Sequence, residues 1–209
     1  MRWIIRTLAV LSVVSWIVVA GLFARPVVSS ETPVSRTREI PVAAKSLPLD
    51  WSRRLLAGSP DVFPGSSPQQ AESIVPIVER YARSFQLDPL MVLAVIQVES
   101  RFDPTAVSAQ GAIGLMQLRG PTARDLAMDL GLEWTGDDLL FDPDLNVLLG
   151  CAYLRRLMDR FGDQDAALAA YCSGPTLVES RRDANGRIPL AYSDRVWDVL
   201  TSLQGKVSA

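Results

Sequence analysis

The chain has 209 residues, of which 48% are hydrophobic, and this is enough for one packed domain with additional segments. Its formal net charge is −2, and the part after residue 54 contains 20 acidic but only 13 basic residues. Such an acidic domain disfavours a nucleic-acid partner. Histidine is absent from the chain, which excludes histidine-based triads and most zinc sites. We therefore expect no metal and no cofactor, and we expect acid–base chemistry to fall to carboxylate, tyrosine or lysine side chains.

The first candidate element is an uncharged run at residues 7–24, TLAVLSVVSWIVVAGLFA, which follows Arg2 and Arg6. Its length is just sufficient to cross a bilayer, and basic residues before such a run hold that end in the cytoplasm. Two interpretations remain open. Residues 1–24 are either a retained transmembrane signal anchor or a signal peptide cleaved near Ala20. Both interpretations export the remainder of the chain.

Residues 25–66 are punctuated by Pro, Ser and Thr and show no sustained hydrophobic periodicity. This composition is typical of a tether, so the segment is predicted to be a linker. Within it, WSRRLLA at residues 51–57 is a candidate for a short docked helix.

Regular helix signals begin at Ser67, where SPQQ provides a capping residue, a proline at the first helical position and a glutamine at the third. Asp-Pro pairs at residues 88–89 and 142–143 begin two further helices in the same way, and the second of these extends to Phe161. Residues 67–204 are thus predicted to be one mainly α-helical domain. The remaining predicted elements are helices at residues 121–130, 165–173 and 193–203, with a candidate short hairpin around SAQGAIG at residues 108–114.

The helix that begins at Asp88-Pro89 carries the candidate catalytic residue. Residues 90–98, LMVLAVIQV, are apolar on every side apart from Gln97, which is typical of a helix buried in the protein centre. Glu99 follows directly, so its carboxyl group lies against apolar side chains, and desolvation is expected to raise its pKa. A carboxylic acid that stays protonated near neutral pH suits proton donation to a glycosidic oxygen. The alternative is a structural ion pair between Glu99 and a base such as Arg101 or Arg124.

The residues after Glu99 favour the catalytic interpretation. The stretch ESRFDPTAVSAQGAIGLMQL contains Ser108, a turn with Gly111 and Gly114, and an amide at Gln117. Glycines at such a turn allow the backbone to approach a ligand closely. This composition is unusual for ordinary core and indicates a binding site.

Five segments resemble one known family, the lytic transglycosylases of the soluble-lytic-transglycosylase (SLT) type, which have a lysozyme-like catalytic domain. They occur in the family's order over about residues 70–203, and the last is the weakest match. The segments are IQVESRFDPTAVSAQGAIGLMQL, TARDLA, FDPDLNVLLGCAYL, LAAYCSGP and GRIPLAYSDRVWDVL. The resemblance implies a mainly α, lysozyme-like fold.

The resemblance also implies an activity. Members of the family cleave the β-1,4 bond between N-acetylmuramic acid and N-acetylglucosamine in peptidoglycan and leave a 1,6-anhydro ring on the muramic acid. A single carboxylic acid, which matches Glu99, acts first as acid and then as base. The implied partner is the peptidoglycan strand. The apolar run at residues 7–24 adds the inner membrane as a partner through the N-terminal helix, and the small size of the chain favours a role in partnership with a cell-envelope machine. The implied location is the bacterial cell envelope, with the domain in the periplasm.

Three further site residues follow from the resemblance. Ser108 and Gln117 match polar positions that line the sugar site, and Tyr171 matches a tyrosine close to the catalytic carboxyl. Each has a structural alternative: Ser108 caps the following turn, Gln117 is a satisfied loop amide, and Tyr171 is plain core.

The chain departs from the family pattern at several positions. Cys172 replaces an asparagine, Arg119 replaces a methionine, and Ala191 stands where a late glutamate is usual. These departures keep two alternatives open: a non-catalytic peptidoglycan-binding or scaffold protein, and a hydrolytic muramidase on the same fold. Cys172 and Cys151 are the only thiols, and the sequence leaves open whether they form a disulfide or stay free.

Overall fold

The computed structural model describes Leu47 and residues 50–57, 62–185 and 187–208. The apolar run at residues 7–24, predicted as an anchor or signal peptide, lies outside the described residues, as does most of the predicted linker. Among the helices that are described, none combines the length and the apolar character needed to cross a membrane.

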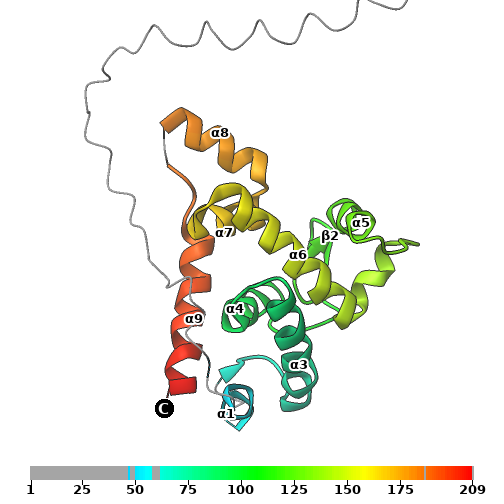
Figure 1. The fold of residues 1–209 in the computed structure, drawn as a ribbon, viewed down its shortest axis with the longest axis vertical. Helices are drawn as coiled ribbons and strands as arrows, with labels where there is room; N and C mark the ends of the chain where they lie inside the picture. Colours follow the sequence, from blue (N-terminus) through cyan, green and yellow to red (C-terminus); the bar gives the residue numbers. More distant parts are fainter. Residues whose placement is uncertain (1–46, 48–49, 58–61, 186, 209) are drawn as a thin grey trace, which may run out of the picture. The chain divides into compact units, whose positions relative to one another are not determined.

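The described residues form a mainly helical domain with one small hairpin (Figure 1). The helices that the sequence predicts are present, with shifts of a few residues at their ends. In chain order the elements are α1 (Trp51–Ala57), α3 (Pro68–Ser84), α4 (Pro89–Glu99), β1 (Ala112–Ile113), β2 (Leu118–Arg119), α5 (Gly120–Asp129), η1 (Asp137–Phe141), α6 (Pro143–Phe161), α7 (Gln164–Ser173), α8 (Pro175–Asn185) and α9 (Ala191–Ser208).

Helix α4 is the centre of the domain. Asp88 caps it by accepting a hydrogen bond from the Leu90 N–H, and Pro89 occupies the first helical position. Every residue from Pro89 to Ile96 is buried, as the apolar sequence predicts. Helices α3 and α9 pack against α4 from either side, and Figure 1 shows α4 between them. The carboxyl end of α4, which carries Glu99, is therefore placed inside the domain.

The start of α3 confirms the predicted cap. Ser67 accepts a hydrogen bond from the Gln70 N–H at 3.2 Å, and the Gln70 side chain accepts one from the Ser67 N–H at 2.7 Å. This reciprocal pair satisfies two N–H groups that a helix start leaves unpaired. Pro76 lies inside α3, on its exposed face.

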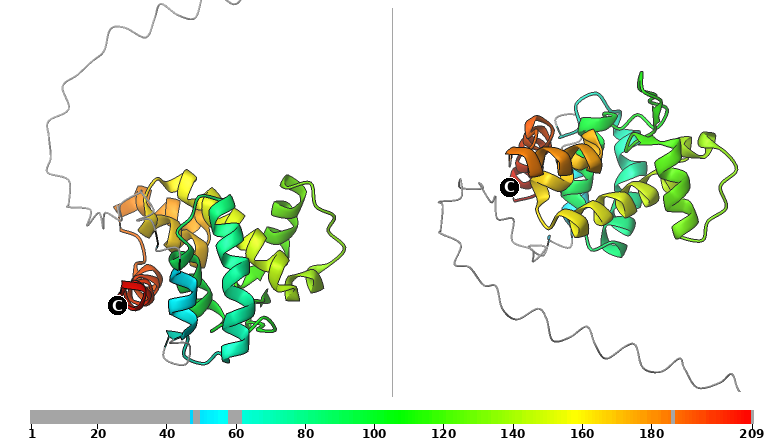
Figure 2. Two further views of the ribbon diagram at one scale, coloured as in Figure 1. Left: turned by 60° about the horizontal axis from the view of Figure 1, so that its bottom comes forward. Right: turned by 90° about the horizontal axis from the view of Figure 1, so that it is seen from above.

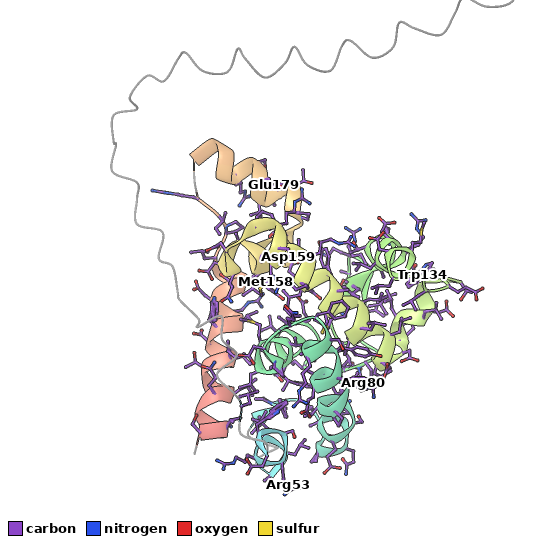
Figure 3. All side chains as sticks on the ribbon, in the orientation of Figure 1. Arg53, Arg80, Trp134, Met158, Asp159 and Glu179 are labelled. Carbon is purple, nitrogen blue, oxygen red and sulfur yellow. The ribbon has the colours of Figure 1, made fainter. Side chains whose placement is uncertain are left out.

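Helix α6 ends where the sequence predicts, at Phe161, because Gly162 adopts the left-handed conformation (φ 61°). Two elements are additional to the predicted set, α8 and the short 3₁₀ helix η1. The apolar periodicity of α8 is weak, and of its described side chains only Val178 is buried. The guanidinium of Arg160 holds α8 to α6 through two hydrogen bonds to the Glu179 carboxylate, at 2.8 and 2.9 Å. Figure 3 labels Glu179 on α8.

A turn closed by an antiparallel bridge between Val107 and Ile113 is present at the predicted residues 108–114, and the hairpin continues beyond them, because β1 pairs antiparallel with β2 at residues 118–119. It is held to α6 by Asn146, whose side chain is fully buried. Its carbonyl oxygen accepts from the Met116 N–H at 2.8 Å, and its amide donates to the carbonyls of Ile113 and Leu140, each at 2.9 Å. Gly114 (φ 78°) is required beside it, because a Cβ there would lie 2.3 Å from the Asn146 amide nitrogen.

Part of the chain before Ser67 also contributes to the core. Trp51 and Leu55 of α1 are buried, and the Phe63 ring packs on that of Phe102 with centroids 4.5 Å apart. These residues lie within the range 25–66 that the sequence predicts as a linker. Figures 1 and 2 show α5 and η1 at the end of the domain opposite α9. Helix α6 extends between these ends, since it packs on α3, α5, α7 and η1.

Replacing Asn146 tests its role in holding the hairpin. Asn146→Ala leaves the Met116 N–H and two carbonyls buried without their partner, and we expect it to lower the free energy of unfolding by about 3 kcal/mol. Urea denaturation followed by circular dichroism measures this. The exposed Gln204→Ala on α9 is the control and is expected to stay within about 0.5 kcal/mol of the wild type. A loss of that small size in Asn146→Ala would contradict the assigned role.

Candidate active site

Glu99 is the last residue of α4 and is half-buried. The Tyr192 hydroxyl, from the first turn of α9, donates a hydrogen bond of 2.6 Å to Glu99 Oε1. The structure therefore does not support the alternative in which Glu99 is paired with Arg101 or Arg124: no ion pair to Glu99 exists among the described residues, and Arg124 is 3.8 Å from Asp125.

The surroundings of Glu99 act on its pKa in opposite directions. Burial raises the pKa above its ordinary value of 4.5, as the sequence predicts. The Tyr192 hydrogen bond and the positive charge of Arg195 both favour the carboxylate, and they offset part of this increase. The net direction is upward. Such a group can hold a proton in one state of a reaction and exist as a hydrogen-bonded carboxylate in another.

Three tyrosine rings pack in sequence beside Glu99. The Tyr171 ring lies between the other two. It stacks on Tyr192 with ring centroids 6.5 Å apart, and it packs against Tyr153 with centroids 5.3 Å apart. Burial raises the pKa of Tyr171 well above its usual range, and the negative charge of Glu99 adds to this increase. The same two causes raise the pKa of Tyr192 well above its usual range, so the phenols of Tyr171 and Tyr192 both stay protonated at neutral pH. Tyr171 lies near the carboxyl, as predicted, while Tyr192 makes the direct hydrogen bond.

Tyr171 also links the helical side of the site to the hairpin. Its hydroxyl donates to the Met116 carbonyl at 2.7 Å, and the N–H of the same Met116 is held by Asn146. Met116 itself is fully buried, and a Cβ at Gly150 would lie 2.2 Å from its sulfur. The segment that leads into Gln117 is thus held from α6 and α7 together.

Gln117 adopts a left-handed backbone conformation (φ 47°), which is uncommon for a residue with a side chain. Its amide donates to the carbonyls of Ala106 at 3.1 Å and Gly114 at 2.9 Å. Ser108 Oγ accepts from the Ala112 N–H at 3.0 Å and so caps the turn that precedes β1. Both side chains are half-buried. Ser108 thus makes the turn-capping contact, and the Gln117 amide makes the loop contacts, that the structural alternatives to a sugar-binding role describe. No direct hydrogen bond joins either one to Glu99 among the described residues.

The two cysteines are free thiols, so the structure does not contain the disulfide that the sequence left open. Cys151 is fully buried in α6, and burial raises its pKa to about 12. Cys172 is exposed at the end of α7, where partial desolvation of the thiol and the charge of Glu99 both raise its pKa. One side chain faces the core and the other faces solvent, which keeps the sulfurs apart.

Sequence reasoning missed two residues of this network, Tyr192 and Asn146. Tyr192 lies 93 residues after its partner Glu99, and only tertiary packing brings the two together. The asparagine had a signal, because a polar residue in the apolar stretch LNVLLG of a helix requires buried partners. In the part of the chain that the structure describes, no cluster of acidic or cysteine side chains is arranged to hold a metal ion.

Tyr192→Phe tests the hydrogen bond to Glu99. Because this bond stabilises the carboxylate, its loss is expected to raise the pKa of Glu99 further. Titration of the Glu99 carboxyl carbon by NMR measures the change. Tyr153→Phe is the matched control, since that ring contacts Tyr171 and not the acid. An unchanged or lower pKa in Tyr192→Phe would contradict the assignment.

The raised pKa of Glu99 also predicts how stability depends on pH. The folded state favours the protonated acid, so ionisation of Glu99 costs folding free energy. The cost is absent below pH 4.5, the ordinary value, and complete above the raised pKa. Glu99→Gln cannot ionise, so its Tm relative to the wild type is expected to increase as pH rises through this window. Thermal unfolding at several pH values checks this, with exposed Glu72→Gln on α3 as control. A difference in Tm that is independent of pH would contradict it.

Comparison with protein-family models identifies the family of this domain. Residues 76–188 match the model described as Transglycosylase SLT domain. A membrane-bound lytic murein transglycosylase C from Histophilus somni is 32% identical over 149 residues, which is 64% of this chain and 41% of that protein. A transglycosylase of Enterobacteria phage PRD1 is 41% identical over 90 residues, covering 43% of this chain and 31% of that protein. The chain thus spans about two fifths or less of the length of these relatives.

Solved structures agree with this placement. The chain is similar to an inactive mutant of the lytic transglycosylase Slt from Pseudomonas aeruginosa, with 27% identity and a TM-score of 0.50, covering 75% of this chain and 25% of that one. The 70 kDa soluble lytic transglycosylase from Escherichia coli shares the fold, with 23% identity and a TM-score of 0.51 over 75% of this chain and 26% of that one. The match to the family model includes Glu99 and the hairpin, and it covers more than half of the chain. The chain therefore belongs to the transglycosylase SLT domain family.

Proposed function

We propose that the chain is a peptidoglycan lytic transglycosylase. It cleaves the β-1,4 bond between N-acetylmuramic acid and N-acetylglucosamine and leaves 1,6-anhydro-N-acetylmuramic acid. The observation that carries this proposal is the Glu99 carboxyl: it is half-buried, its pKa is raised, and it accepts a 2.6 Å hydrogen bond from Tyr192. Relatives named lytic murein transglycosylase support the same activity.

Glu99 acts in two steps. In the first, its proton passes to the glycosidic oxygen as the bond from the muramic acid C1 to that oxygen breaks, and the carboxylate remains. In the second, this carboxylate takes the proton of the sugar's own 6-hydroxyl, whose oxygen bonds to C1 and closes the anhydro ring. The acid is thereby regenerated. Burial favours the protonated form needed first, while Tyr192 and Arg195 stabilise the carboxylate between the steps.

This route needs no second carboxylate. Ordinary glycosidases use two, one as acid and one as nucleophile or base. Here the substrate supplies the attacking oxygen. Among the described residues, the charged side chain that acts on the pKa of Glu99 is the cation Arg195.

The other parts of the proposal extend from the same residues. Ser108, Gln117 and Tyr171 contribute to binding the glycan, and the catalytic domain covers residues 67–204. In this arrangement the hairpin presents backbone and amide groups to the sugar, since Gln117 donates its N–H groups internally and its carbonyl oxygen has no protein donor among the described residues. Residues 1–24 hold or export the domain at the inner membrane, so that it acts in the periplasm on peptidoglycan strands, in partnership with a cell-envelope machine.

The central experiment is digestion of purified sacculi with the wild type and Glu99→Gln. The wild type is expected to release muropeptides with 1,6-anhydro ends, identified by mass spectrometry, and the variant is expected to be slower by about 10³-fold because no proton donor remains. Exposed Glu72→Gln serves as the control for loss of one carboxylate and is expected to retain the wild-type rate.

Each alternative gives a distinct result. Release of reducing muramic acid ends in place of anhydro ends would indicate a hydrolytic muramidase. Equal digestion by the wild type and Glu99→Gln, or no digestion by either, would defeat the catalytic proposal and favour a peptidoglycan-binding protein.

A further inference from the structure

A turn at residues 63–66 lies directly before α3 and ahead of the residues 76–188 that match the family model. The turn closes on itself, because the Phe63 carbonyl accepts from the Ser66 N–H at 3.1 Å and from the Ser66 hydroxyl at 2.9 Å. Phe63 is fully buried, as is most of Val62 before it. This part of the predicted linker therefore belongs to the packed domain.

Phe63 contacts the chain just after the acid. Its ring packs on that of Phe102, three residues after Glu99, with centroids 4.5 Å apart and the planes inclined at 57°. Both rings are fully buried. Phe102 has a left-handed backbone conformation (φ 65°), which costs energy for a residue with a large side chain. Burial of its ring against Phe63 offsets this cost and keeps the conformation.

The next two residues of the turn contact the chain on either side of the acid. The Pro64 carbonyl accepts a hydrogen bond from the Gln97 side-chain amide at 3.0 Å. Gly65 borders the Arg101 side chain, since a Cβ added to the glycine would lie 3.5 Å from the Arg101 Cδ. Gln97 lies two residues before Glu99, and Arg101 lies two residues after it. The turn therefore holds the chain both before and after the acid.

Glu99 depends on such contacts because it is the last residue of α4. Helix ends fray, and contacts beyond the helix are needed to hold them. Directly after the Ser100 cap the chain turns away through Arg101 and Phe102, which are both left-handed. A change in this turn would move the Glu99 carboxyl relative to the Tyr192 hydroxyl, which lies on a different helix and donates to it at 2.6 Å.

We propose that Phe63 is a positioning residue for the reaction, which acts through Phe102 to fix the place of the catalytic carboxyl. The turn at residues 63–66 is then needed for full activity, although the family model does not extend to it. The inference rests on the proposed function, because a carboxyl that donates its proton to a glycosidic oxygen has to lie within hydrogen-bond reach of that oxygen. Small displacements of a reacting group cost large factors in rate.

Kinetics of the full chain with Phe63→Ala and Phe63→Leu test this. Soluble, uncrosslinked peptidoglycan strands are the substrate, so that kcat and KM for the release of anhydro products are measured separately. Phe63→Ala is expected to lower kcat about thirtyfold and to leave KM within about twofold, because the buried ring acts on the acid and not on the glycan. Phe63→Leu keeps most of the apolar volume and is expected to lower kcat only about fivefold.

A double-mutant cycle shows whether Phe63 acts through Phe102. Phe102→Leu breaks the ring pair and is expected to lower kcat by itself. In that background Phe63→Leu is expected to lower kcat further by less than about twofold, because the contact is already lost.

The matched control is Phe161→Leu at the carboxyl end of α6, where the buried ring lies under the Arg160 guanidinium. It is expected to lower the Tm as Phe63→Leu does but to leave kcat within about twofold of the wild type. All rates are measured below the Tm of each variant. The carbon NMR signal of the Glu99 carboxyl gives a second measurement without turnover. At fixed pH it is expected to shift in Phe63→Leu and to stay in place in Phe161→Leu.

The inference is overturned if Phe63→Ala raises KM at unchanged kcat, if Phe63→Leu and Phe161→Leu lower kcat equally, or if the effects of Phe63→Leu and Phe102→Leu multiply. An unshifted Glu99 carbon signal in Phe63→Leu would also overturn it. Failure of the proposed function gives a different result, the absence of anhydro products from the wild type, and the carbon signal then still decides whether Phe63 positions the carboxyl.

Discussion

The hydrogen bond between Tyr192 and Glu99 is the contact on which the site depends. It joins the end of the buried helix α4 to the first turn of α9, and these two helices pack along each other. Packing removes the carboxyl from water and raises its pKa, while the phenol and Arg195 give the ionised form a partner. A proton donor that later becomes a base needs both influences. The α4–α9 interface therefore controls the protonation of the Glu99 carboxyl as well as the packing of the domain.

The hairpin side of the site depends on a second chain of contacts. Asn146 holds Met116 from α6, and Tyr171 holds the same residue from α7 while its ring stacks on Tyr192. Gln117, with its uncommon backbone conformation, follows directly. Buried polar groups that are fully hydrogen-bonded give a site a single arrangement.

The charged residues divide into two groups with different roles. Most ion pairs of the domain lie on the surface, such as that between Arg160 and Glu179, and contribute little to stability individually. Arg101 and Arg195 instead line one recess between the carboxyl end of α4 and the start of α9, and the charge of Arg195 acts on Glu99.

The sequence by itself determined the helices and the burial of α4, and it indicated Glu99 as the candidate acid, because capping residues, helical periodicity and an apolar run next to Glu99 are local signals. It also identified the family through its motifs. Helix α8 was missed since its apolar periodicity is weak. Only the tertiary structure decided that Tyr192 is the direct partner of Glu99, that Ser108 and Gln117 hold the hairpin, and that the cysteines stay apart. These outcomes depend on which faces of distant helices meet, and no local pattern of residues encodes that choice.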